Sequence, residues 1–333
     1  MKQLCKEDYT VGWICALPVP EWKASRTLLD EVHKDLPLGA AAKLQYVYGT
    51  MNAHNVVMGC LPDSQTGVGA AAAVASEMGS TFTRMRFGLL VGVGGGMPSE
   101  ASDIRLGDIV VCRPDTKAGH GGVIQYDIGK ALQGGVFEPT GMLNQPPELL
   151  LSALGKVHAA PRAQSALPKY LEVFTQEEED DIDFSKRPLE DKLFEAHYAH
   201  EEEETCRTCD PAAEVKRTKR KSKLPRVHYG TIACGNQVMK DAAKRDEISK
   251  RCKGILCFEM KAAGLMNRFE CLVIRGICDY CDSHKNKEWQ PYDAAAAAAW
   301  AKWLLKDVSL EPEAAQVIGG AQIYNAVSEG MYS

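Results

Sequence analysis

Two acidic residues stand directly after apolar stretches of the kind that form buried strands. Asp279 ends the run CLVIRGICD, and Glu21 follows the turn of Pro18 and Pro20 after the run TVGWICAL. A carboxyl group at the carboxyl end of a strand lies where α/β sheets bind ligands, and partial removal from water helps it to hold a proton. Both residues are therefore candidates for general acid or base chemistry. Each also has a structural alternative, since Asp279 could cap the next segment and Glu21 could be a first-turn helix acid.

A cluster of glycines follows another apolar run. The run FGLLVGVGGGM contains Gly92, Gly94, Gly95 and Gly96. Glycines at a strand end let backbone N–H groups approach a ribose, a phosphate or an attacking water. The spacing GxGxxG is absent, so this is not a dinucleotide fingerprint, and a tight structural turn is the alternative.

The run GILCFEM ends on Met260, which stands between Glu259 and Lys261. Strict strand alternation would place Glu259 and Lys261 on one face and Met260 on the other. A methionine in an apolar strand is most often part of the core.

Cysteine usage favours a reducing compartment over a disulfide scaffold. Many of the 12 cysteines lie in apolar runs, where a small buried thiol fits. The pair Cys206-x-x-Cys209 is a weak metal signal, because a structural zinc needs four ligands and no second CxxC or HxxxH stands nearby. We expect no metal and no cofactor.

Composition narrows the class of protein. The chain has 333 residues, 45% hydrophobic and 25% charged, and its net charge is -5. This balance predicts neither a nucleic-acid partner nor a membrane surface, and no stretch reaches the roughly 20 apolar residues that cross a bilayer. We therefore expect a soluble cytoplasmic protein that acts on small molecules.

Strand-like and helix-like segments alternate along most of the chain, which predicts an α/β domain with a largely parallel sheet. Strands are expected at 10–17, 87–97, 107–112, 227–235, 254–260 and 271–279, with a further pair within 45–61. Helices are expected at 21–32, 68–78, 144–157, 241–252, 262–268 and 294–306.

The segment 161–225 breaks this pattern with charged blocks such as QEEEDDIDF, EEEE and KRTKRKSK. We interpret it as a charged, partly disordered surface insertion in a domain that spans 9–308. Residues 309–333 have the character of a C-terminal tail or linker.

Cleavage of an N-glycosidic bond needs an acid at the departing base, groups that hold the ribose and a positioned nucleophile. Asp279, the glycine segment and Glu21 are candidates for these roles.

These elements, in this order, resemble the purine nucleoside phosphorylase/uridine phosphorylase superfamily. They resemble more closely its nucleosidase-like domains in fungal NACHT, ankyrin or TPR receptors. The resemblance covers Tyr9 to Val308 and rests on YTVGWICALPVPEWKA, RFGLLVGVGGGMP, DIRLGDIVV, GGVIQYDIGK, HYGTIACGNQVMKD, CFEMKAAGLMN and LVIRGICDYCDSHKNKEWQPY. It implies a single α/β domain with a central twisted mixed sheet flanked by helices.

The resemblance implies a role for each candidate residue. Asp279 would protonate N7 of a purine, and Glu21 would activate water, although Pro20 makes its turn one residue longer than usual. Met260 would pack under the ribose. Gly94 and Gly95 would line the side of the sugar and the nucleophile.

The base would be bordered by Asn236, Gln237 and Val238. The resemblance also implies a homo-oligomer, because related enzymes complete each pocket with residues from a neighbouring subunit.

Two departures from the family pattern bear on activity. Phosphorylases carry an arginine just before the glycine turn, where this chain has Leu90 and Val91, so water is favoured over inorganic phosphate as co-substrate. The usual Glu-Met-Glu motif is Glu259-Met260-Lys261 here, and an ammonium cannot accept the ribose hydrogen bonds. Glu259 could compensate in part, or Lys261 could serve a phosphorylated sugar.

The sequence thus favours hydrolysis of a purine nucleoside or nucleotide. The alternatives are phosphorolysis by a glycosyltransferase of this superfamily, and a nucleoside-binding signalling module that has lost turnover through Lys261.

Overall fold

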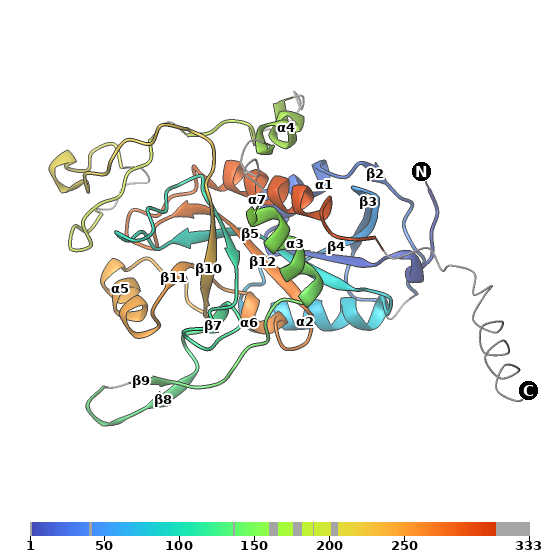
Figure 1. Cartoon of the computed structure of the whole chain (residues 1–333), viewed down its shortest axis with the longest axis horizontal. Coiled ribbons are helices and arrows are strands. Elements are labelled where there is room, and N and C mark those ends of the chain that lie inside the picture. Colours follow the sequence, from blue (N-terminus) through green and yellow to red (C-terminus); the bar gives the residue numbers. More distant parts are fainter. Residues whose placement is uncertain are drawn as a thin grey trace, which may run out of the picture.

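A mixed β-sheet forms the centre of the domain, with helices packed around it (Figure 1). The computed structural model describes residues 2–39, 42–135, 137–159, 166–175, 182–188, 190–200 and 206–310. Its strands are β1 (Val11–Cys15), β2 (Glu31–Val32), β3 (Tyr46–Met51), β4 (His54–Cys60), β5 (Phe87–Gly96), β6 (Ile109–Cys112), β7 (Val123–Gln125), β8 (Gly129–Ala131), β9 (Phe137–Pro139), β10 (Val227–Cys234), β11 (Ile255–Glu259) and β12 (Cys271–Asp279). Its α-helices are α1 (Lys23–Thr27), α2 (Gly67–Thr81), α3 (Glu148–Ala159), α4 (Leu167–Leu171), α5 (Ala242–Arg251), α6 (Ala262–Leu265) and α7 (Gln290–Leu305).

The strand order brings the glycine-rich end of β5 next to two other strand ends. The order is β11-β10-β6-β12-β5-β1-β4-β3-β2, with β7 on β10. Strand β5 pairs in parallel with β1 and β12, and its last residues also pair antiparallel with β11, where Phe258 lies opposite Gly95. This second pairing closes one part of the sheet on itself. The mixed sheet confirms the expected fold class, in which parallel strands predominate.

Helices cover both faces of the sheet. On β1, Trp13 donates a hydrogen bond from Nε1 to Ser25 of α1 at 3.0 Å, whereas a Cβ on the adjacent Gly12 would contact Met78 of α2. Adjacent residues of a strand point to opposite faces, so α1 and α2 lie on opposite sides. Helix α7 packs on β5 and β12 on the same side as α1, and α6 packs with α2.

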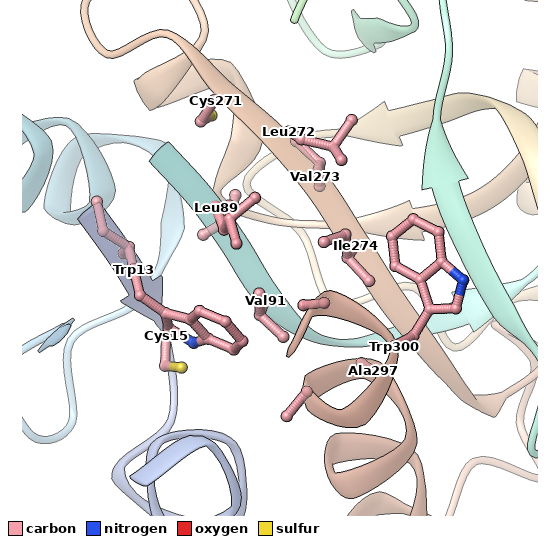
Figure 2. Packing of buried hydrophobic residues seen from close by; sticks show 14 of the residues in the cluster. Trp13, Cys15, Leu89, Val91, Cys271, Leu272, Val273, Ile274, Ala297 and Trp300 are labelled. Carbon is pink, nitrogen blue, oxygen red and sulfur yellow. The ribbon is translucent and has the colours of Figure 1, made fainter. Parts of the chain in front are cut away.

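The core consists of apolar strands sandwiched between these layers. Every residue of β5 and β12 is buried, as expected for strands covered on both faces. Figure 2 shows Leu89 and Val91 of β5, Ile274 of β12 and Trp300 of α7 in this cluster. Gly276 of β12 allows α7 to approach closely, since a Cβ at this position would lie 2.1 Å from the carbonyl oxygen of Asp293.

The predicted helix at 21–32 is wrong in its second half. The chain forms a turn at Pro18–Trp22 and the short α1, and then Glu31–Val32 pairs with β3 as an edge strand. The backbone N–H groups of Asp30 and His33 donate to carbonyls of that neighbour. This tertiary pairing satisfies the backbone and overrides the apolar periodicity of the segment. The other expected strands and helices are present, with shifted boundaries.

The described part of the insertion folds onto the domain. Helix α4 packs against α7, and Leu167, Phe174 and Phe184 are buried in the core. Residues 160–165, 176–181, 189 and 201–205 of this region, and the tail beyond 310, lie outside the described residues. Within the described ranges, none of the helices is long and apolar enough to cross a membrane.

Candidate active site

Glu21 is anchored between the end of β1 and the glycine segment of β5. Its Oε2 atom accepts hydrogen bonds from the backbone N–H groups of Ala16 and Leu17 at 2.7 and 3.0 Å. Its Oε1 atom accepts one from Val93 at 2.9 Å, and the side chain is buried. Three backbone donors therefore hold this carboxylate in one orientation.

Asp279 lies buried at the end of β12, as the sequence predicted for its strand position. Its Oδ1 atom accepts from the N–H of Cys281 at 2.9 Å, and its Oδ2 atom is paired with the ammonium of Lys285. Burial disfavours that ammonium, but the Asp279 carboxylate outweighs this effect and raises the pKa of Lys285 above its ordinary value. Asp279 also acts in part as a cap of the segment that follows β12, because it accepts the hydrogen bond from the backbone N–H of Cys281.

Two glycines of β5 leave the space that these carboxylates occupy. A Cβ at Gly92 would lie 2.3 Å from Oε1 of Glu21, and a Cβ at Gly95 would lie 2.5 Å from Oδ1 of Asp279. Gly94 stands between them, where a Cβ would lie 3.0 Å from the carbonyl oxygen of Phe258. One strand therefore has both carboxylates against its backbone, three residues apart. Gly95 thus lies next to the candidate acid and Gly92 contacts Glu21, whereas Gly94 faces Phe258 and Arg275.

Sequence reasoning assigned no role to Arg275, which lies in this site. It is fully buried in β12 and donates from Nη2 to Oε2 of Glu259 at 2.6 Å. Burial alone would raise the pKa of Glu259, but Arg275 outweighs it and lowers that pKa below its ordinary value. A Cβ at Gly92 would lie 2.7 Å from Nη1 of Arg275, on the side of Glu21. The signal in the sequence is a lone arginine within the apolar run CLVIRGICD.

Both carboxylate oxygens of Glu259 already accept hydrogen bonds from other residues of the protein. Besides Arg275, it accepts from the N–H groups of Lys261 and Ala262 at 2.9 Å each. Lys261 immediately precedes the short helix α6 and is 9% exposed, and Met260 beside it is partly exposed. Since Glu259 is tied to Arg275, its oxygens are poorly placed to replace the ribose contacts expected of a glutamate at 261.

Asn236, Gln237 and Val238 form an exposed edge after β10. Asn236 accepts from the N–H of Val68 at 3.0 Å, and its own N–H donates to Asp127 at 2.7 Å. This edge therefore borders the start of α2. Its proposed contact with a base stays a prediction.

A cavity of about 620 Å³ adjoins Asp279. Its walls combine the strand end and the insertion, and include Asp279, Tyr280, His284, Lys186, Cys206 and Arg207. Among the described residues, Glu21, Met260 and Lys261 do not line it. The cavity therefore lies on one side of Asp279 and does not enclose both carboxylates.

Comparison with known proteins supports the fold. The 5′-methylthioadenosine/S-adenosylhomocysteine nucleosidase of Neisseria meningitidis, solved with methylthio-immucillin-A, has a TM-score of 0.56 at 16% identity and covers 89% of this chain and 98% of its own. The Streptococcus pneumoniae nucleosidase with 8-aminoadenine has 0.57 at 16%, covering 90% and 99%. A futalosine hydrolase mutant of Helicobacter pylori has 0.56 at 14%, also covering 90% and 99%.

In sequence, the chain is 45% identical over 310 residues to a nucleotide-binding leucine-rich repeat (NLR)-like protein of Hyaloscypha variabilis. The match covers 92% of this chain but spans only 30% of that relative's length. No protein-family model matches the chain. The chain therefore has the same fold as these nucleosidases and is a sequence relative of one segment of an NLR-like protein.

Proposed function

We propose that this domain hydrolyses the N-glycosidic bond of a purine nucleoside or nucleotide. The observation that carries the proposal is that two buried carboxylates, Asp279 at the end of β12 and Glu21 after β1, lie at the carboxyl ends of the two strands that flank β5 in parallel. Structural neighbours that are nucleosidases, solved with an immucillin and with 8-aminoadenine, support a purine-type substrate.

Each carboxylate has a distinct part in the reaction. As the bond between the sugar carbon and the base breaks, Asp279 gives its proton to N7 of the purine. Water adds to the sugar carbon, and Glu21 takes a proton from it. The products are the free base and the (phospho)ribose. In this structure Asp279 is a carboxylate paired with the ammonium of Lys285, so it must first take up a proton from solvent as the purine displaces Lys285. Transfer of that proton to N7 then regenerates the carboxylate.

Water is favoured as the nucleophile over phosphate. Leu90 and Val91 are buried apolar residues where a phosphate-binding arginine would stand in a phosphorylase. The guanidinium of Arg275 is committed to Glu259 through Nη2. The carboxylates of Glu259 and Glu21 together outweigh the charge of Arg275, so an inorganic phosphate would meet no net positive charge next to the glycine segment.

Within the described part of the chain, Arg275 has unpaired hydrogen-bond donors next to Glu21, where the attacking water would bind. Its Nε and Nη1 atoms are buried and have no hydrogen-bond partner among the described residues. Such donors are costly to leave unpaired, and Nη1 lies beside Gly92 and Glu21. We assign it the role of holding a water or a ribose hydroxyl near Glu21.

Lys261 favours one alternative, a domain that binds a nucleoside without turning it over. An ammonium offers only donors where the family has a carboxylate for the ribose hydroxyls. The domain would then signal occupancy rather than release a base.

The proposal is tested by incubating the purified protein with adenosine, inosine, guanosine, AMP and ATP, each with and without inorganic phosphate. Chromatography should detect free base in the absence of phosphate. Base that appears only with phosphate would establish phosphorolysis instead. Binding of these compounds without any base release would support the binding module.

Substitution of each carboxylate tests the role proposed for it. Asp279→Asn and Glu21→Gln should each abolish most base release, whereas Glu138→Gln, on the exposed hairpin of β8 and β9, should not. Circular dichroism and thermal unfolding of each variant separate lost chemistry from lost folding. Undiminished release by folded Asp279→Asn would refute the assignment of the acid.

A further inference from the structure

Four potential metal ligands meet where the insertion contacts the loop after β12. One ligand atom from each of His200, Cys206, Cys209 and His284 lies within 4.8 Å of every other. Three of them belong to the insertion, and His284 comes five residues after Asp279. The CxxC pair thus has the two partners that the sequence spacing did not reveal.

The distances fit a shared ion. Nδ1 of His284 lies 3.6 Å from Sγ of Cys206 and 3.6 Å from Sγ of Cys209. Zinc–sulfur bonds of about 2.3 Å and zinc–nitrogen bonds of about 2.0–2.1 Å, at a tetrahedral angle, place the two ligand atoms about 3.6 Å apart. A thiol hydrogen bond to the single lone pair of Nδ1 would account for one short contact, but not for two equal ones.

The orientation of His284 is fixed by its other nitrogen. Nε2 lies 3.1 Å from the carbonyl oxygen of Tyr198. A carbonyl only accepts hydrogen bonds, so Nε2 must have the hydrogen, and in the neutral ring Nδ1 then presents a lone pair to both sulfurs. A backbone carbonyl that fixes the far nitrogen in this way is typical of metal-bound histidines.

Contacts with neighbouring residues help to position the two histidines of the cluster. Phe194 stacks on the ring of His284, with 4.1 Å between centroids and 20° between planes. The backbone N–H of His200 donates to Ser283 at 2.9 Å, and that of His284 donates to Asp282 at 3.0 Å. The two cysteines are free thiols rather than a disulfide. Two thiols and two imidazoles suit a borderline-soft cation.

We propose that His200, Cys206, Cys209 and His284 form a structural Cys₂His₂ zinc site. Four protein ligands complete a tetrahedral shell and leave no position for a substrate, so the metal has a structural rather than a catalytic role. It fastens the insertion to the loop that holds Lys285, the partner of Asp279. Cys206 and His284 also line the cavity beside Asp279, so the zinc stabilises one wall of that cavity.

The first test is the metal content of the full chain, purified without chelator and measured by inductively coupled plasma mass spectrometry. We expect about one zinc per chain, as a four-ligand site requires. The variants Cys206→Ser, Cys209→Ser and His284→Gln should lose it. The matched controls Cys252→Ser and His197→Gln change a cysteine and a histidine outside the cluster and should retain it.

Cobalt substitution tests the geometry even if a ligand variant fails to fold. After removal of zinc, Co²⁺ added to the unaltered chain should produce the absorption bands of tetrahedral thiolate coordination. Chelation should also lower the thermal unfolding temperature, because metal binding contributes to folding.

Three results would overturn the proposal. One is a chain that contains no zinc and takes up none when Zn²⁺ is added. Another is zinc retained at full occupancy in folded Cys206→Ser/Cys209→Ser. The third is a cobalt spectrum without thiolate bands. None of these measurements depends on glycosidic cleavage, so the zinc site and the proposed activity can fail separately.

Discussion

Arg275 and Glu259 form an ion pair that is closed off from solvent, with 2.6 Å between Nη2 and Oε2 and no exposure of either side chain. The pair links β12 to β11, the two strands that bring Asp279 and Met260 to the site. Because both charges are removed from water, each is stabilised mainly by the other.

Removal of one partner of this pair should strongly destabilise the protein. Arg275→Met leaves the Glu259 carboxylate buried without its cation, which costs about 3–5 kcal/mol in comparable cases. Urea unfolding measures the change. Arg275→Met/Glu259→Gln should recover part of it, whereas Lys192→Met, in the partly exposed pair with Glu190, should cost less than about 1 kcal/mol. Equal effects for the buried and the exposed pair would contradict the argument.

Substitution of Gly95 should reduce both stability and activity. In Gly95→Ala the new Cβ would lie 2.1 Å from Sγ of Cys281 and 2.5 Å from Oδ1 of Asp279, so both must move. We expect a loss of about 1–3 kcal/mol of unfolding free energy and a clear fall in base release. Gly69→Ala is the matched control, because it lies in α2 with nothing within 4 Å of its Cβ and should gain about 0.5–1 kcal/mol. An active, stable Gly95→Ala would show that the strand end has room to spare.

Restoring a carboxylate at 261 should increase turnover if the ribose site is otherwise intact. Lys261→Glu would return two hydrogen-bond acceptors, worth a few kcal/mol or about two decades of rate. Steady-state release of base from each nucleoside measures the change. Lys261→Gln separates the new carboxylate from mere removal of the positive charge. A fall in activity on nucleotides, but not on nucleosides, would instead indicate that Lys261 serves a phosphorylated sugar.

Stability should decline toward alkaline pH through Asp293. This residue of α7 is fully buried, and burial, followed by the nearby Asp108, raises its pKa well above the ordinary value. An acid with a raised folded pKa stabilises the protein below its unfolded value, near pH 4, and loses that contribution as pH rises toward the folded value. Each pH unit in this window costs about 1.4 kcal/mol.

Asp293→Asn should therefore flatten the alkaline decline measured by urea unfolding between pH 4 and pH 8. Any constant cost of the amide cancels in the difference between the two pH values. The exposed Asp63→Asn serves as the control. A pH dependence unchanged from that of the unaltered chain would show that Asp293 is not the group responsible.

Much of the architecture could be predicted from local pattern. Apolar runs located β1, β5, β10, β11 and β12, and small-residue or amphipathic stretches located α2, α5 and α7. The placement of Asp279 and Glu21 at strand ends followed from the same runs. The exception was Glu31–Val32, where pairing with β3 replaced the expected helix, because backbone pairing between distant segments is invisible to periodicity.

The residues that make up the site were harder to predict from the sequence. Among the four glycines named from the sequence, Gly94 and Gly95 were expected on the side of the nucleophile, but the contact with Glu21 belongs to Gly92. No role was predicted for Arg275, because the residues around an arginine in an apolar strand do not indicate which distant residue it will pair with. The described insertion residues such as Leu167 and Phe184 enter the core despite the charged sequence around them.

The amino-acid sequence by itself determined which segments become buried strands and which chemical groups end them, because hydrophobic periodicity and chain direction act over a few residues. Only the tertiary structure decided which distant groups meet. Cys206 and His284 are 78 positions apart in the chain, yet their sulfur and nitrogen lie 3.6 Å from each other. That contact depends on strand order and on how the insertion packs, and both arise from the burial of the whole domain rather than from any local pattern.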